Sequence, residues 1–115
     1  MLRNKMSKIE NVLNALADQT RLQLLNLIAS RGHATATTLA TIVPVSRQAV
    51  VKHLTVLKGA GLVASDRVGR EVQYTVCPNQ LSETAEWMTK LAADWDSRLE
   101  WIKCVAEDAD ESDLT

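Results

Sequence analysis

An arginine and a glutamine stand side by side at Arg47 and Gln48, directly after a serine that can begin a helix. The Ser46 oxygen can accept a hydrogen bond from a free N–H of the first helical turn. In the major groove of DNA, arginine pairs bidentately with guanine and glutamine with adenine. Two polar residues taken alone are more often part of a solvated helix face. The residues on either side favour the DNA-contacting interpretation.

Those neighbours predict two short helices joined by a tight corner. Pro44 ends the first helix, because its ring removes an N–H and clashes with the preceding turn. The two helices have apolar faces that predict their burial. In the first helix this face holds Leu39, Ala40, Ile42 and Val43, and in the second it holds Ala49, Val50, Leu54 and Leu57.

A basic hairpin is predicted after the second helix. Residues Leu62–Asp66 and Glu71–Val76 read as strands, the second with strict alternation of apolar and polar residues. Between them, residues 67–70 form a glycine-containing loop with Arg67 and Arg70. A basic hairpin loop alone is more often simply solvated. Placed after such a helix, it predicts a wing whose arginines reach phosphates or a narrow minor groove.

In this order the motifs resemble the ArsR-type winged helix-turn-helix transcription regulators, over roughly residues 9–105. The matching segments are LADQTR at Leu16–Arg21, LATIVPVSRQAVVKHL at Leu39–Leu54 and LKGAGLV at Leu57–Val63, followed by the basic turn and Tyr74. The chain departs from the family pattern at Gln19, where proline is frequent, and at Pro44, where glycine is frequent. The resemblance implies a homodimeric repressor that binds double-stranded DNA.

The segments before the corner predict two further helices. Apolar spacing predicts a first helix over Ser7–Leu16. Asp18 or Thr20 can cap a second helix that is apolar around much of its circumference and is therefore expected in the core. This helix is expected to end near Gly32, before a very short strand at His33–Thr35.

The last helix opens at Pro78 and Asn79 and carries an apolar seam with alternating spacings of four and three. The seam contains Leu81, Ala85, Met88, Ala92, Trp95, Leu99, Ile102 and Ala106, and Trp87 and Leu91 widen it. Such a seam can pack on its own domain. A helix of about 25 residues would run about 37 Å, however, which is more than this domain can cover. The predicted dimer residues are therefore Val12, Leu13 and Leu16 of the first helix with Leu81, Ala85, Met88, Leu91, Ala92, Trp95, Leu99 and Ile102 of the last.

The predicted fold is mainly α-helical with a small β-hairpin, a winged helix-turn-helix with a long C-terminal dimerisation helix. It would occupy residues 1–106, and the acidic, aperiodic residues 107–115 are expected to be a disordered tail. The net charge of −1 conceals a division between the two parts of the chain. Residues 1–76 hold ten basic and four acidic side chains, whereas residues 77–115 hold three basic and ten acidic ones. This division predicts a basic binding surface separate from an acidic region.

The predicted DNA contacts are Ser46, Arg47, Gln48, Val51, Lys52, His53, Lys58, Arg67 and Arg70. His53 could donate to a phosphate or equally pack beside Leu54. A second hypothesis is a winged-helix protein-interaction module without DNA binding. The five cations among these residues, against only Asp66 across residues 46–70, favour DNA.

The residues that could support other functions are few and scattered. Cys77, Cys104, His33 and His53 stand in unrelated contexts, and the four glycines form no phosphate loop, so neither an enzyme nor a cofactor is expected. No apolar run reaches the eighteen residues of a membrane span. The N-terminal MLRNKMSKIE lacks the apolar middle of a signal peptide, so a cytoplasmic location is expected.

The resemblance also bears on metal sensing. Metal-responsive members of the family use a cysteine pair on the helix before the corner, or histidine with carboxylates on the last helix. Here residues 37–42 contain neither cysteine nor histidine, and residues 77–115 contain no histidine. We expect no metal response through those two sites. Control by abundance, by an organic ligand or by a partner of undisclosed identity is expected instead.

Overall fold

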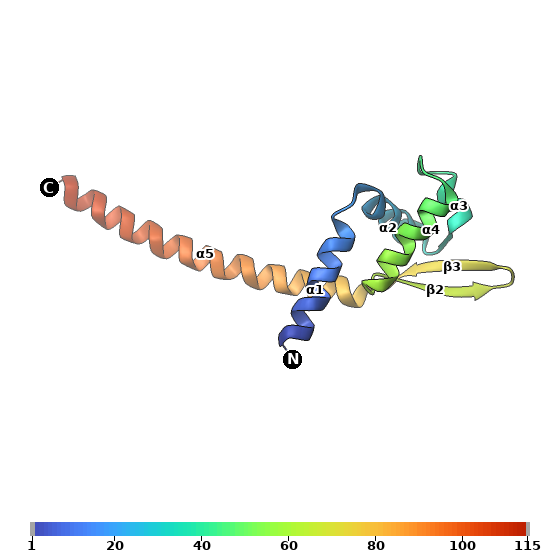
Figure 1. The fold of residues 1–115 in the computed structure, drawn as a ribbon. Coiled ribbons are helices and arrows are strands. Elements are labelled where there is room, and N and C mark those ends of the chain that lie inside the picture. The colour runs from blue at the N-terminus through green and yellow to red at the C-terminus, as the bar shows by residue number, and fades with distance from the viewer. Residues whose placement is uncertain (1, 115) are drawn as a thin grey trace. The chain divides into compact units, whose positions relative to one another are not determined.

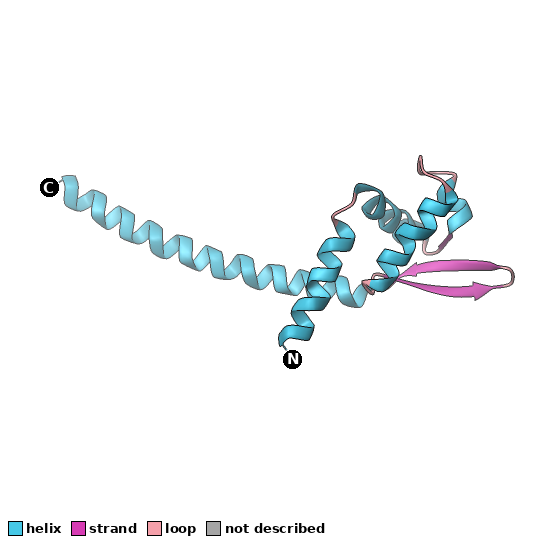
Figure 2. Cartoon of the chain, in the orientation of Figure 1, coloured by secondary structure: helices cyan, strands magenta, loops and turns pink. Residues whose placement is uncertain are grey.

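The computed structural model describes residues 2–114, with side chains described for residues 5–106. The chain divides into two compact units, residues 1–84 and residues 85–115. The mainly helical fold with a small antiparallel sheet agrees with the sequence prediction (Figures 1 and 2). Its elements are α1 (Leu2–Leu16), α2 (Gln19–Arg31), β1 (Ala34–Thr35), α3 (Ala36–Ala40), α4 (Arg47–Gly59), β2 (Val63–Val68), β3 (Glu71–Val76) and α5 (Pro78–Leu114).

Helix α2 contributes three buried side chains to the core and is capped at both ends. The Asp18 carboxylate accepts a hydrogen bond from the backbone N–H of Arg21 at 3.0 Å, so Asp18 is the N-cap. This hydrogen bond lowers the pKa of the Asp18 carboxyl below its ordinary 3.8, and the Arg21 guanidinium also lowers it. Gly32 ends the helix at φ 87°, in the region that favours glycine. The core side chains of α2 are Leu24, Leu25 and Ile28.

Helix α1 packs one face against this core. Ile9, Val12 and Ala15 are buried, at 2%, 0% and 1% exposure. The helix begins at Leu2, earlier than the predicted Ser7.

Helix α3 is shorter than the sequence indicates. Thr35 caps it by accepting a hydrogen bond from the N–H of Thr38 at 3.1 Å. The regular helix stops at Ala40, because the Thr41 N–H and hydroxyl both bond back to the Thr38 carbonyl. Ile42 therefore lies beyond the helix and is 40% exposed. The prediction that Ile42 lies on the buried face is therefore wrong, whereas Leu39 and Val43 are buried as predicted.

The three strands form one antiparallel sheet in the order β1-β3-β2. Pairing of β2 with β3 runs from Val63↔Val76 to Val68↔Glu71. A two-residue turn closes the hairpin. Gly69 occupies its first central position at φ 64°, which is the position where type II′ hairpin turns have glycine. The predicted loop over residues 67–70 is too long, and Arg67 lies within β2.

Helix α5 begins in the first unit and makes up the second. Leu81 packs against the core, and Thr84 is buried with its hydroxyl bonded to the Gln80 carbonyl. The helix has 37 residues, a length of about 55 Å, and continues past the predicted end at Ala106. The side chains of residues 107–115 lie outside the described part, so the disorder expected for these acidic residues stays a prediction. Among the described residues, no helix combines the length and apolar character needed to cross a membrane.

Candidate nucleic-acid interface

Helix α4 has one buried face and one polar face. Val50, Leu54 and Leu57 are 0% exposed and anchor the helix in the core. Ser46 caps the N-terminus, its hydroxyl accepting a hydrogen bond from the N–H of Ala49 at 3.1 Å. This capping fixes where the helix starts. The polar face is formed by the exposed residues Arg47, Gln48 and Lys52.

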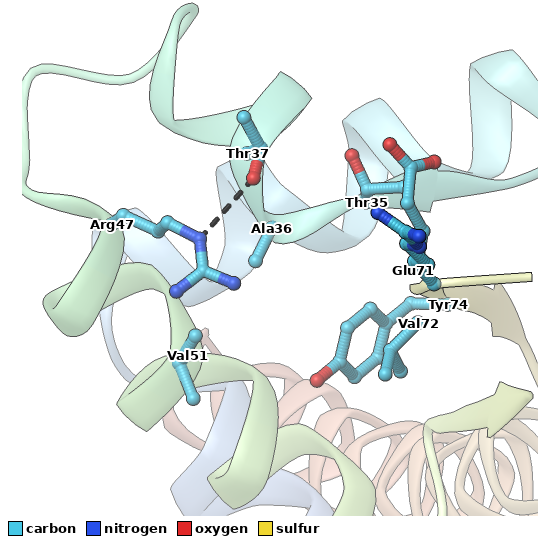
Figure 3. Close-up of a pocket in the computed structure, with 9 residues that line it drawn as sticks. Thr35, Ala36, Thr37, Arg47, Val51, Glu71, Val72 and Tyr74 are labelled. Atoms are coloured by element: carbon cyan, nitrogen blue, oxygen red, sulfur yellow. Dashed lines mark hydrogen bonds between the residues drawn. The ribbon is translucent and has the colours of Figure 1, made fainter. Parts of the chain in front are cut away.

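Arg47 is the first residue of α4 and reaches toward α3. Its Nε donates a hydrogen bond to the Thr37 hydroxyl at 3.1 Å (Figure 3). Arginine side chains carry five donors, so the four N–H groups on the two terminal nitrogens are not used by this bond. Thr37 was not a predicted site residue. It precedes Arg47 by ten positions, and no periodic pattern relates the two.

Arg47 shares a cavity of about 390 Å³ with Arg70 of the hairpin turn. The cavity is lined by residues of β1, α3, α4, the hairpin turn and β3. Val51 and Tyr74 contribute from α4 and β3, and Figure 3 shows them on either side of the hollow. Glu71 is the one carboxylate among the lining residues. The fold therefore brings the first residue of α4 and the turn of the wing, which are 23 positions apart in sequence, to one concave surface.

His53 faces the interior of the first unit. It is half-buried, and its Nδ1 lies 3.4 Å from a terminal nitrogen of Arg21. Arg21 also donates to the carbonyls of Ala15, at 2.7 Å, and Asn14, at 3.2 Å. His53 is thus one side of a polar contact that joins α4 to the α1–α2 junction. This geometry favours the packing role over a phosphate contact.

Lys58 lies in the last turn of α4, about 16 Å along the helix axis from Arg47. Its Nζ donates to the Ser65 hydroxyl at 2.7 Å and so links α4 to β2. Arg67 is exposed on β2, with Val72 as its partner across the hairpin. Arg47, Val51 and Arg70 meet at the cavity, whereas His53 and Lys58 contact other elements of the chain.

Comparison with known proteins identifies the family to which this chain belongs. A family model described as a helix-turn-helix domain matches residues 16–66, from the end of α1 into β2. A solved structure of an ArsR-like transcriptional regulator from Rhodococcus sp. RHA1 is similar with a TM-score of 0.80 and 41% identity. That similarity covers 90% of this chain and 96% of the other. The chain belongs to the ArsR family of winged helix-turn-helix transcriptional regulators.

Two other relatives place this ArsR-family chain among regulators rather than enzymes. The transcriptional repressor SdpR of Bacillus subtilis is 29% identical over 91 residues, which cover 79% of this chain and all of SdpR. A homodimeric winged helix-turn-helix DNA-binding domain from Mycobacterium bovis is 28% identical with a TM-score of 0.62. That match covers 77% of this chain and 81% of the other domain.

The predicted dimer residues of this ArsR-family chain differ in their accessibility. Val12 is fully buried within its own core and presents no surface to a second copy, whereas Leu13 is exposed and Leu16 half-buried. Leu81 is half-buried against the core. The other seam residues on α5 are exposed, the large ones at 44–55%: Ala85, Met88, Leu91, Ala92, Trp95, Leu99 and Ile102.

Residues with metal-binding chemistry are dispersed over residues 5–106 of this ArsR-family chain. Within residues whose side chains are described, no three of the histidines, cysteines, aspartates and glutamates group together. Cys77 is half-buried at the end of the sheet, and Cys104 is exposed on α5. Insensitivity to metals stays a prediction.

Proposed function

We propose that this ArsR-family regulator is a homodimeric repressor that binds an imperfect palindrome in double-stranded DNA. The observation that carries the proposal is the cavity shared by Arg47 and Arg70. It puts an exposed arginine of the recognition helix and an exposed arginine of the wing on one concave surface. Helix-turn-helix proteins insert the N-terminal residues of the second helix into the major groove.

The nine candidate side chains divide into those that contact bases, those that contact the DNA backbone and those with a structural role. Arg47 and Gln48 contact base edges, because both are exposed in the first turn of α4. Ser46, Lys52, Arg67 and Arg70 position the DNA backbone. Val51 lines the shared cavity beside them. His53 takes a structural role, because its Nδ1 lies against Arg21. Lys58 links α4 to β2 through one of its three donors.

A dimer is supported by the exposed seam on α5. Large apolar side chains exposed in one helix at heptad-like spacing favour pairing with another helix. The related M. bovis domain is homodimeric. A two-fold dimer presents two recognition helices to half-sites about one helical turn apart, which is why the operator is expected to be palindromic.

The repressor role rests on similarity to SdpR and on a simple mechanism. A dimer seated on two half-sites occludes the promoter that contains them. The protein would act in the cytoplasm. Its release from DNA would be triggered by an organic ligand or a partner rather than by a metal ion at the family's usual sites.

Selection of duplexes from a random pool by the purified protein tests the function directly. The expected result is an enriched imperfect palindrome. A salt titration on random duplex then separates this function from the protein-interaction module. If Lys52, Arg67 and Arg70 of both subunits meet phosphates, log Kd should change with log salt by roughly 5. No enriched motif and no salt-dependent binding would refute the proposal.

A further inference from the structure

The contact between Arg47 and Thr37 has a consequence for how a base is read. Arginine can approach guanine side-on, with Nε and one terminal nitrogen, or end-on, with both terminal nitrogens. The bond from Nε to the Thr37 hydroxyl occupies the side-on donor. Of the two bidentate modes, only the end-on pair of terminal nitrogens remains available.

We infer that Thr37 is a positioning residue that holds the Arg47 guanidinium for an end-on bidentate contact with guanine O6 and N7. This inference rests on the proposed DNA-binding function and deepens it. Thr37 itself contacts no base. It acts by reducing the freedom that Arg47 must lose when DNA binds.

The surroundings of the pair support this role. Thr37 lies on α3, which is joined to the sheet through β1 and packs against α4, so the hydroxyl is held by a fixed backbone. Arg47 is exposed, and among the described residues its side chain makes one hydrogen bond, the bond to Thr37. An exposed arginine without such an anchor samples many rotamers. Ordering one such side chain on binding costs about a two- to twelvefold loss of affinity per subunit.

The test compares Thr37→Val with Thr37→Ser in the full-length protein. Valine keeps the β-branched shape but removes the acceptor, and serine restores the hydroxyl. Kd is measured on the selected operator and on duplexes with each guanine replaced in turn. Because both subunits of the dimer lose the bond, Thr37→Val should weaken operator binding about five- to 160-fold. It should also reduce the discrimination against substitution at one guanine, and Thr37→Ser should stay within about twofold of wild type.

A double-mutant cycle with Arg47→Ala tests the coupling. In the Arg47→Ala background, Thr37→Val should have no further effect, because no guanidinium remains to be held. A merely structural role would move the melting temperature but not the base preference at one position. The melting temperature and the salt slope should therefore match wild type.

Three outcomes would overturn the inference. Thr37→Val could bind and discriminate like wild type, or it could weaken all duplexes equally in both backgrounds, which would indicate a direct phosphate contact by the hydroxyl. Arg47→Ala could also leave the selected motif unchanged. Failure of the proposed function is separate, because the wild-type protein would then select no motif at all.

Discussion

Arg70 offers the most quantitative test of how the wing is used. It lies in the two-residue turn of the hairpin, is exposed, and lines the cavity that contains Arg47. Each phosphate neutralised by a cation contributes about 0.9 to the dependence of log Kd on log salt. A dimer with three such cations per subunit has a slope of roughly 5.4, and Arg70→Ala in both subunits reduces it to roughly 3.6. Between 50 and 200 mM salt, wild type should therefore lose about 2,000-fold in affinity and the variant about 150-fold.

The assay is fluorescence anisotropy on one operator duplex and one random duplex, over at least four salt concentrations. Arg31→Ala is the matched control, because Arg31 is an exposed arginine in the last turn of α2, outside the proposed contacts. Its slope should equal that of wild type. Arg70→Ala should change the slope on both duplexes by the same amount. An unchanged slope for Arg70→Ala, or an equal change for Arg31→Ala, would refute the assignment of the wing to phosphates.

Three other predictions concern the base contact, the dimer and the pH dependence of stability. Arg47→Ala should cost about 1–3 kcal/mol per half-site and relax the preference at one position of each half-site, measured by repeating the selection. Leu99→Asp places a charge in the exposed seam and should produce monomers in sedimentation, whereas the exposed Ser97→Asp, off the seam, should not; an unchanged dimer for Leu99→Asp would contradict the α5 interface. The pKa of Asp18 is lowered in the folded state, so its stabilising effect is present above 3.8 and is lost as pH falls below that value. Melting temperatures of wild type should fall over that range more steeply than those of Asp18→Asn, which keeps a capping oxygen but does not ionise; equal slopes would contradict the prediction.

Local chemistry made much of the fold predictable. Ser46 and Gly32 act within one helical turn of their positions, and the alternating residues of β3 need only a neighbouring strand. Ile42 was misplaced because helical spacing was extended through Thr41, whose hydroxyl favours ending the helix. Arg67 was placed in a loop because the sequence does not distinguish a two-residue turn from a four-residue one.

The candidate site was less predictable, because its contacts join residues that are distant in sequence. The position of Arg47 at the start of a helix follows from the Ser46 cap. Its bond to Thr37 depends on how α3 crosses α4, and the bond from Lys58 to Ser65 depends on where β2 returns. Val12 was assigned to a dimer because apolar spacing shows which face of α1 is buried but not what covers it.

The attachment of the hairpin at two points has a consequence for the length of the DNA site. On one side Lys58 bonds to Ser65, and on the other β3 pairs with β1 immediately before α3. The wing and the recognition helix are therefore fixed relative to each other before DNA binds. The distance between their DNA contacts is set by the protein. Because phosphates recur at every base pair, a wing that meets the backbone at this fixed separation should tolerate both base changes and one inserted base pair between the two contact points of a half-site. A wing that read base edges would instead lose affinity on either change.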